Sequence, residues 1–130
     1  METPQTGYKV KPYHIPVKRY CQTLDLRDSP ELIAEYRKRH SRQEVWTEIL
    51  AGIREVGILE MEIYILGTRL FMIVETPIDF DWSTAMARLN TLPRQQEWEK
   101  YMSVFQQAIS GMSSTEKWKP MERMFHLYNI

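Results

Sequence analysis

The chain has 130 residues, of which 43% are hydrophobic and 26% charged, a balance typical of one folded globular domain. Lys and Arg number 17 and so do Asp and Glu, so there is no basic field to recruit nucleic acid or anionic lipid. The single cysteine, Cys21, excludes an internal disulfide and a thiolate-clustered zinc site. Without a membrane-length apolar run or a signal-peptide core, we expect a cytoplasmic protein that binds a neutral polar ligand.

The first predicted elements are an irregular arm and a strand. Residues 1–16 are interrupted by prolines and a glycine, and we expect this arm to pack on the surface through Tyr8 and Tyr13. Residues 17–26 are rich in β-branched and aromatic side chains and predict a strand. We therefore expect one domain over residues 17–130, preceded by the arm.

Two helical stretches follow. Ser29-Pro30-Glu31 is a typical helix start, with a capping hydroxyl, proline at the first helical position and an acid in the first turn. Leu32, Ile33, Tyr36 and His40 then recur at helical spacing, and Trp46, Ile49, Leu50 and Ile53 form a second stripe. The polar segment 40–44 between them predicts a break, and Gly57 a C-terminal cap.

The second half begins with a hairpin. Residues 58–66 alternate, with Leu59, Met61, Ile63 and Ile65 on one face and Glu60, Glu62 and Tyr64 on the other. Gly67-Thr68 turns the chain into a strand over residues 69–76. We then expect helices over residues 79–90 and 93–109, a loop over 110–120 and a last strand over 121–128.

This order of elements is β-α-β-β-α-β with an extra helix, the pattern of the ferredoxin-like α+β fold with an antiparallel sheet. The helices of such a fold cover one face of the sheet and leave the other face open. Because an open face is usually covered by a partner, we expect a homodimer formed through the sheet.

The candidate reactive residue is His40. Tyr36 and His40 are four residues apart and share the inward face of the first helix. His40 is then either a buried structural histidine or a general acid/base, since imidazole titrates near neutrality. The other histidines, His14 and His126, lie on different elements, so a metal site built from the three is disfavoured.

Other motifs are weaker. Catalytic motifs such as a phosphate-binding glycine loop, GxSxG or HExxH do not occur. A lone strand cysteine such as Cys21 is usually a small core residue. Trp98 fits either the core or a platform for the apolar face of a sugar, and Glu99 would by default be a solvated helix residue.

Several segments together resemble the L-rhamnose mutarotase family over roughly residues 17–128. They are EYRKRH (35–40), WTEI (46–49), IYILGTRLFMIVE (63–75), QEWEKYM (96–102) and FHL (125–127). The resemblance implies a dimeric ferredoxin-like α+β barrel that interconverts the anomers of a deoxyhexose, most simply L-rhamnose, without a cofactor or metal.

The resemblance also implies roles for individual residues. His40 matches the family's catalytic histidine, described as a proton donor, Tyr36 its sugar-binding tyrosine, and Trp98 the first of a paired tryptophan contact. The chain departs from the family where Glu99 replaces the second tryptophan and Met61 a substrate-contacting tyrosine. We therefore expect Met61 and Glu99 in the sugar site, with the preferred sugar left open between L-rhamnose, L-fucose and related sugars.

In the mechanism that we expect, His40 protonates the ring oxygen as the pyranose opens to the aldehyde, with Tyr36, Glu99 or water as the group that deprotonates the anomeric hydroxyl. Two other classes remain alternatives because one fold hosts many functions. They are a cofactor-free or haem-dependent monooxygenase on the same dimeric barrel, and a non-catalytic sugar-binding module.

Overall fold

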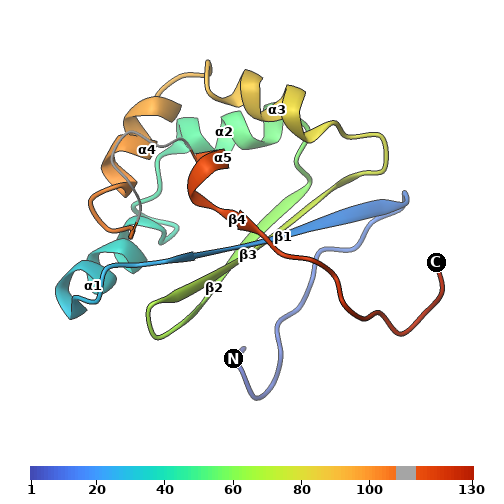
Figure 1. The fold of residues 1–130 in the computed structure, drawn as a ribbon, viewed down its shortest axis with the longest axis horizontal. Coiled ribbons are helices and arrows are strands. Elements are labelled where there is room, and N and C mark those ends of the chain that lie inside the picture. Colours follow the sequence, from blue (N-terminus) through green and yellow to red (C-terminus); the bar gives the residue numbers. More distant parts are fainter. Residues whose placement is uncertain (108–113) are drawn as a thin grey trace.

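A computed structural model describes residues 1–107 and 114–130. Its four-stranded antiparallel sheet has the order β2-β3-β1-β4, and the helices cover one face of that sheet (Figure 1). This is the expected ferredoxin-like α+β fold. In chain order the elements are β1 (Val17–Asp25), α1 (Pro30–Arg39), α2 (Thr47–Glu55), β2 (Glu60–Leu66), β3 (Arg69–Pro77), α3 (Trp82–Leu89), α4 (Gln95–Met102), α5 (Ser114–Lys117) and β4 (Lys119–Pro120).

The predicted hairpin is confirmed. Strands β2 and β3 pair from Glu60 opposite Glu75 to Leu66 opposite Arg69, and Gly67 in the turn has φ of +61°. Strand β1 pairs with the other edge of β3 along its whole length. Met61, Val74 and Tyr20 are therefore neighbours across three strands, and the alternation that the sequence shows fixes which face looks toward the helices.

The start of α1 is also as predicted. Ser29 is the N-cap, and its side chain accepts a hydrogen bond from the Leu32 backbone N–H at 3.3 Å. Residues 40–46 break the helical run before α2, and Gly57, with φ of +102°, follows the last turn of α2. His40 consequently occupies the C-cap of α1, directly after the last helical residue.

Replacing Ser29 with alanine is expected to lower the free energy of unfolding by about 1 kcal/mol, because one backbone N–H at the start of α1 loses its partner. Urea unfolding monitored by circular dichroism measures this loss. Ser83→Ala is the matched control, since Ser83 lies exposed in the first turn of α3 and Asp81 caps that helix. Equal stabilities for the two variants would contradict the capping role.

Some expectations for the second half are wrong. The predicted helix over residues 79–90 begins only at Trp82, where Asp81 caps it. The helix expected over residues 93–109 ends at Met102, because Gln106 bridges to Leu26 and Gln107 donates to the Asp25 carbonyl, which pulls this segment to the end of β1. Residues 108–113, which fall in this helix and in the loop expected over 110–120, lie outside the described residues. The rest of that loop contains α5 and β4.

The last strand is misplaced by the sequence prediction. Strand β4 is Lys119–Pro120, paired with Gln22 and Thr23 of β1, and Met121 donates one further backbone bond to the Cys21 carbonyl. Residues 122–130 then run away from the sheet and are exposed (Figure 1). A strand needs a neighbour for its backbone groups, and within this chain the C-terminal segment has such a neighbour for only a few residues.

The N-terminal arm lies on the face of the sheet opposite the helices. The Tyr8 ring meets the Tyr64 ring edge-on at 5.7 Å, and the Tyr13 hydroxyl donates to Glu75 Oε1 at 2.9 Å. Arg19 donates to the other oxygen of Glu75. Burial and the Glu75 carboxylate raise the pKa of Tyr13, so this phenol is neutral and remains a donor.

The apolar core lies between the sheet and the helices. Its buried members come from both layers and are Leu24, Leu26, Tyr36, Ile49, Val56, Ile58, Leu70, Met72, Val74, Ala85, Met86, Leu89, Trp98, Met102, Phe105 and Trp118. Within the described ranges, no helix is long and apolar enough to cross a membrane.

Candidate functional site

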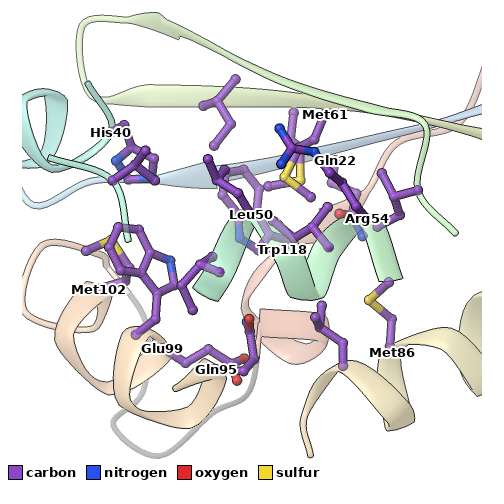
Figure 2. Close-up of a pocket in the computed structure, with 18 of the residues that line it drawn as sticks. Gln22, His40, Leu50, Arg54, Met61, Met86, Gln95, Glu99, Met102 and Trp118 are labelled. Carbon is purple, nitrogen blue, oxygen red and sulfur yellow. The ribbon is translucent and has the colours of Figure 1, made fainter. Parts of the chain in front are cut away.

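A cavity of about 590 Å³ opens between the helix-facing side of the sheet and helices α2 and α4. The strands contribute Gln22, Met61, Ile63 and Met72, and the helical side contributes aliphatic residues of α2 and the inner face of α4. Figure 2 shows Gln95 and Glu99 entering from α4 on the side opposite His40 and Met61. The five residues predicted for the sugar site all line this cavity: Tyr36, His40, Met61, Trp98 and Glu99.

The imidazole of His40 is oriented by its own helix. Its Nδ1 lies 2.8 Å from the carbonyl oxygen of Tyr36. Because a carbonyl only accepts, Nδ1 carries the proton in this hydrogen bond, and in the neutral ring Nε2 is then the basic nitrogen. The ring also packs against Tyr36 at 4.3 Å and edge-on against Trp98 at 5.4 Å between ring centroids.

Burial lowers the pKa of His40, and the hydrogen bond to the Tyr36 carbonyl opposes that effect only in part. The cause is desolvation, since a charged imidazolium loses water in this partly buried site. At neutral pH the ring is therefore neutral. In that state it accepts a proton at Nε2 rather than donating one.

Tyr36 lies one turn before His40 and is almost fully buried. Burial raises the pKa of its phenol to about 12, and a hydrogen bond with the Gln106 side chain partly opposes the rise. Tyr36 is therefore a neutral phenol that contributes polarity to the cavity wall without carrying a charge.

The aromatic wall of the cavity is supported from behind. Trp98 meets Trp46 edge-on at 5.0 Å, and Trp46 in turn stacks on Tyr101 at 5.9 Å. The guanidinium of Arg94 lies 3.9 Å from the Trp46 ring centroid, within cation–π range. Trp98 is thus packed against Trp46, which Tyr101 and Arg94 hold in turn.

Glu99 is buried, contrary to the default expectation of a solvated helix residue. It shares the inner face of α4 with Gln95, Trp98 and Met102, which are the buried residues of that helix. The buried Lys117 ammonium donates to the Glu99 carbonyl oxygen at 3.1 Å and to Ser103 Oγ at 2.6 Å. Burial lowers the pKa of Lys117, and the negative charge of Glu99 counteracts this.

Sequence reasoning missed several polar residues of the cavity, namely Gln22, Gln95, Gln106 and Lys117. For two of them the sequence pattern indicated an inward position. Gln22 falls on the inward side of β1 between Tyr20 and Leu24, and Gln95 precedes Trp98 and Glu99 by three and four positions on one helix face. The sequence pattern gave no such indication for Gln106, because its position depends on the backbone bridge to Leu26 at the end of β1.

The other two histidines do not join His40. His14 lies exposed in the N-terminal arm and His126 exposed in the C-terminal segment. Over residues 1–107 and 114–130, no group of three or more His, Cys, Asp or Glu side chains is arranged to hold a metal ion. The described cavity offers a basic nitrogen, a neutral phenol, amide groups and an indole platform, together with charged side chains of both signs (Arg42, Arg54, Glu60, Glu99 and Lys117). This set is suited to a hydroxylated ligand.

Comparisons with known proteins place this geometry in context. The family model of L-rhamnose mutarotase matches residues 19–127. An L-fucose mutarotase of Xanthomonas campestris pv. campestris is 40% identical over 111 residues, which covers 85% of this chain and 89% of the relative. A UPF0734 protein of Dictyostelium discoideum is 40% identical over 114 residues, 85% of this chain and 90% of that protein.

A solved structure has the same fold. The crystal structure of an L-rhamnose mutarotase from Formosa agariphila superposes with a TM-score of 0.61 at 18% identity. The match covers 85% of this chain and 99% of that one.

Proposed function

The chain belongs to the L-rhamnose mutarotase family, whose members are carbohydrate isomerases, and we propose that it interconverts the α and β anomers of a 6-deoxyhexose in the cavity beside His40. The observation that carries this proposal is the state of His40. Its Nδ1 is engaged by the Tyr36 carbonyl, so the neutral ring offers the basic Nε2 for proton transfer. Mutarotation needs this kind of proton transfer and no redox step.

In the proposed reaction, His40 Nε2 takes the proton of the anomeric hydroxyl while the bond between C1 and the ring oxygen breaks. The electron pair of that bond goes to the ring oxygen, which receives the proton from Nε2, and an open-chain aldehyde results. Rotation about the C1–C2 bond and the reverse transfers close the ring on the other face. Since both oxygens are attached to C1, one imidazole serves both, and His40 is base first and donor second.

The neighbouring residues have supporting roles in this proposal. Tyr36 is a neutral phenol that donates a hydrogen bond to the sugar, because its pKa of about 12 keeps it protonated. Trp98 offers an aromatic face for the apolar side of the pyranose, and Met61 and Glu99 line the part of the wall that differs from the family pattern. Holding the sugar in place contributes to the rate beyond proton transfer itself.

The pH profile tests the order of proton transfer. With His40 acting first as a base, kcat/KM is expected to rise with pH through the lowered pKa of His40, below about 6.5, and to level off toward neutrality. The measurement is the rate of anomer exchange by NMR between pH 4.5 and 8, after subtraction of the uncatalysed rate. A profile that falls as pH rises through this range would instead make the free enzyme's imidazolium the first donor.

L-Rhamnose, which the sequence resemblance favours, and L-fucose are the two candidate sugars. The relative from Xanthomonas is named L-fucose mutarotase and is 40% identical to this chain, so we expect L-fucose to be exchanged at least as fast as L-rhamnose. NMR exchange spectroscopy on a panel of deoxyhexoses and hexoses measures activity and preference together. Binding of these sugars without faster exchange would identify a non-catalytic module and overturn the proposed activity.

We also propose that the protein is a homodimer formed through the sheet face opposite the helices, beside the N-terminal arm that lies on the same face. Half-buried Cys21 and Ile73 lie side by side on that face, and Thr23 and Phe71 form the next row. The C-terminal segment, residues 121–130, leaves β4 on the side of the sheet away from the helices (Figure 1). Six of its side chains are large, apolar and 46–96% exposed: Met121, Met124, Phe125, Leu127, Tyr128 and Ile130.

Such a segment costs free energy if it remains in water, because its large apolar side chains stay exposed there. Its extended backbone is also free to pair with a strand of another chain. A second copy of the chain offers a surface of matching character in its own open sheet face. In the proposed dimer each C-terminal segment therefore packs against the sheet of the other subunit.

A further inference from the structure

Two glutamines in the wall of the cavity each carry a buried oxygen without a hydrogen bond. Gln95 and Gln106 are 5% and 3% exposed, and both line the cavity. Among the buried side-chain polar atoms of residues 1–107 and 114–130, Gln95 Oε1 and Gln106 Oε1 are the ones that lack a partner. Buried polar groups are nearly always paired, so each such oxygen calls for a physical reason.

Both glutamines are held firmly by their backbones. Gln95 is the first residue of α4, its N–H donates to the Leu92 carbonyl at 3.2 Å, and the preceding Arg94 is held in a left-handed conformation with φ of 64°. A non-glycine residue in this conformation is strained, and the surrounding structure must compensate. Here the Arg94 side chain is engaged by Glu97 and by the Trp46 ring, which fixes the start of α4.

Gln106 is fixed from two directions. Its backbone bridges to Leu26 at the end of β1, and its side chain hydrogen-bonds Tyr36. The amide plane is thereby set by Tyr36, while Oε1 has no partner among the described residues. The two oxygens thus belong to opposite regions of one wall, one beside Tyr36 and one a single turn before Trp98 and Glu99.

We propose that Gln95 and Gln106 recognise the ring hydroxyls of the sugar. Each Oε1 accepts a hydrogen bond from one neutral hydroxyl. This inference rests on the proposed mutarotase function and names residues that set its specificity. An amide oxygen accepts from a neutral O–H without requiring a charge on the ligand, as the hydroxyls of a pyranose allow. A site built to pair with a hydroxyl discriminates against analogues that lack it, because its buried oxygen is then left unpaired.

The test replaces each glutamine with methionine, which keeps the length of the side chain and removes the acceptor. In the free protein, the thermal stability of Gln95→Met is expected to stay unchanged or to rise, because an unpaired buried oxygen is removed. Gln106→Met also loses the hydrogen bond to Tyr36 and is expected to be less stable. The KM for L-fucose or L-rhamnose is expected to rise about three- to tenfold for each variant, the loss of one ordinary hydrogen bond. Gln96→Met is the matched control, an exposed position on the same helix, and is expected to change neither quantity.

Monodeoxy analogues of the better substrate identify which hydroxyl donates a hydrogen bond to each glutamine. The KM penalty of Gln95→Met or Gln106→Met is expected to disappear with the one analogue that lacks the hydroxyl paired with that residue. A KM penalty that persists equally with every analogue would overturn the inference in favour of a structural role.

Other outcomes separate this inference from the function on which it rests. If the wild-type protein exchanges anomers and both methionine variants keep its KM for every sugar, bound water satisfies these oxygens and the inference is wrong. If the wild type accelerates exchange of no sugar in the panel, the proposed mutarotase function itself fails.

Discussion

Substitution of His40 by alanine is expected to slow catalysed anomer exchange by about 10²–10⁴-fold, the usual contribution of one positioned acid/base. The variant loses the basic Nε2, whose availability depends on the hydrogen bond between Nδ1 and the Tyr36 carbonyl. It keeps Tyr36 and Trp98, so sugar binding measured by calorimetry is expected to weaken much less than the rate. The measurement is NMR exchange on L-fucose and L-rhamnose at saturating sugar.

The fold is expected to survive this substitution. His40 is the C-cap of α1, and its backbone N–H bonds to Arg37 and Lys38 remain in alanine. His14→Ala is the control, because His14 is an exposed histidine of the N-terminal arm, outside the cavity wall. Exchange at the wild-type rate in a folded His40→Ala protein would remove His40 from the mechanism and leave the cavity without its proposed base.

The parts of the fold that the sequence predicts correctly are those governed by local rules. The alternation in β2 and the Gly67 turn define the hairpin, and Ser29 with Pro30 defines the start of α1. Tyr36 and His40 are one helical turn apart, and the alternation assigns Met61 to the side of the sheet that faces the helices. These residues could therefore be expected to line the same cavity.

The parts that the sequence predicts wrongly depend on contacts between distant segments. Helix α4 ends at Met102 because backbone hydrogen bonds pair the segment around Gln106 and Gln107 with the end of β1. The two segments are far apart in the sequence, so no local pattern predicts this pairing. The same pairing places Gln106 beside Tyr36. Glu99 is likewise buried beside Lys117, which comes from another element and bonds its backbone carbonyl, whereas an isolated helix pattern assigns a glutamate to the solvent.

These long-range contacts also explain how the cavity combines stability with polarity. The buried Lys117 ammonium is compensated by the Glu99 carbonyl and the Ser103 hydroxyl, so the cation does not face the cavity unpaired. The aromatic contacts from His40 through Trp98 to Trp46 fix the wall that a ring would stack on. Reactivity in the proposed site therefore resides in a single neutral imidazole, which the rest of the wall orients and partly dehydrates.

The strand predicted over residues 121–128 is wrong for a different reason, which concerns the proposed dimer. The segment 121–128 has the composition of a strand, yet β1 offers it pairing for only a few residues. A strand-like segment without a neighbour in its own chain is explained if the neighbour belongs to another copy. The sequence pattern and the isolated chain are then both consistent with the proposed homodimer.

Replacing Met124 and Phe125 together with glutamate is therefore expected to convert the dimer into a monomer. These side chains are 95% and 70% exposed in the single chain. Burial of one large apolar side chain contributes roughly 1.5–3 kcal/mol, so losing two is expected to weaken association at least about 100-fold. Sedimentation equilibrium at micromolar concentration measures the change, and circular dichroism checks that each monomer is folded.

Two comparisons make the result specific to the proposed interface. Val104→Glu is the matched control, because Val104 is apolar, 52% exposed and lies two residues after the end of α4, outside both the sheet and the C-terminal segment. This variant is expected to remain dimeric. Phe71→Glu changes the open sheet face instead of the C-terminal segment and is expected to dissociate the dimer as well. If each C-terminal segment packs on the sheet of the other subunit, both the segment and the sheet face contribute to the dimer. A dimer that persists in the Met124/Phe125 variant or in Phe71→Glu would place the interface elsewhere.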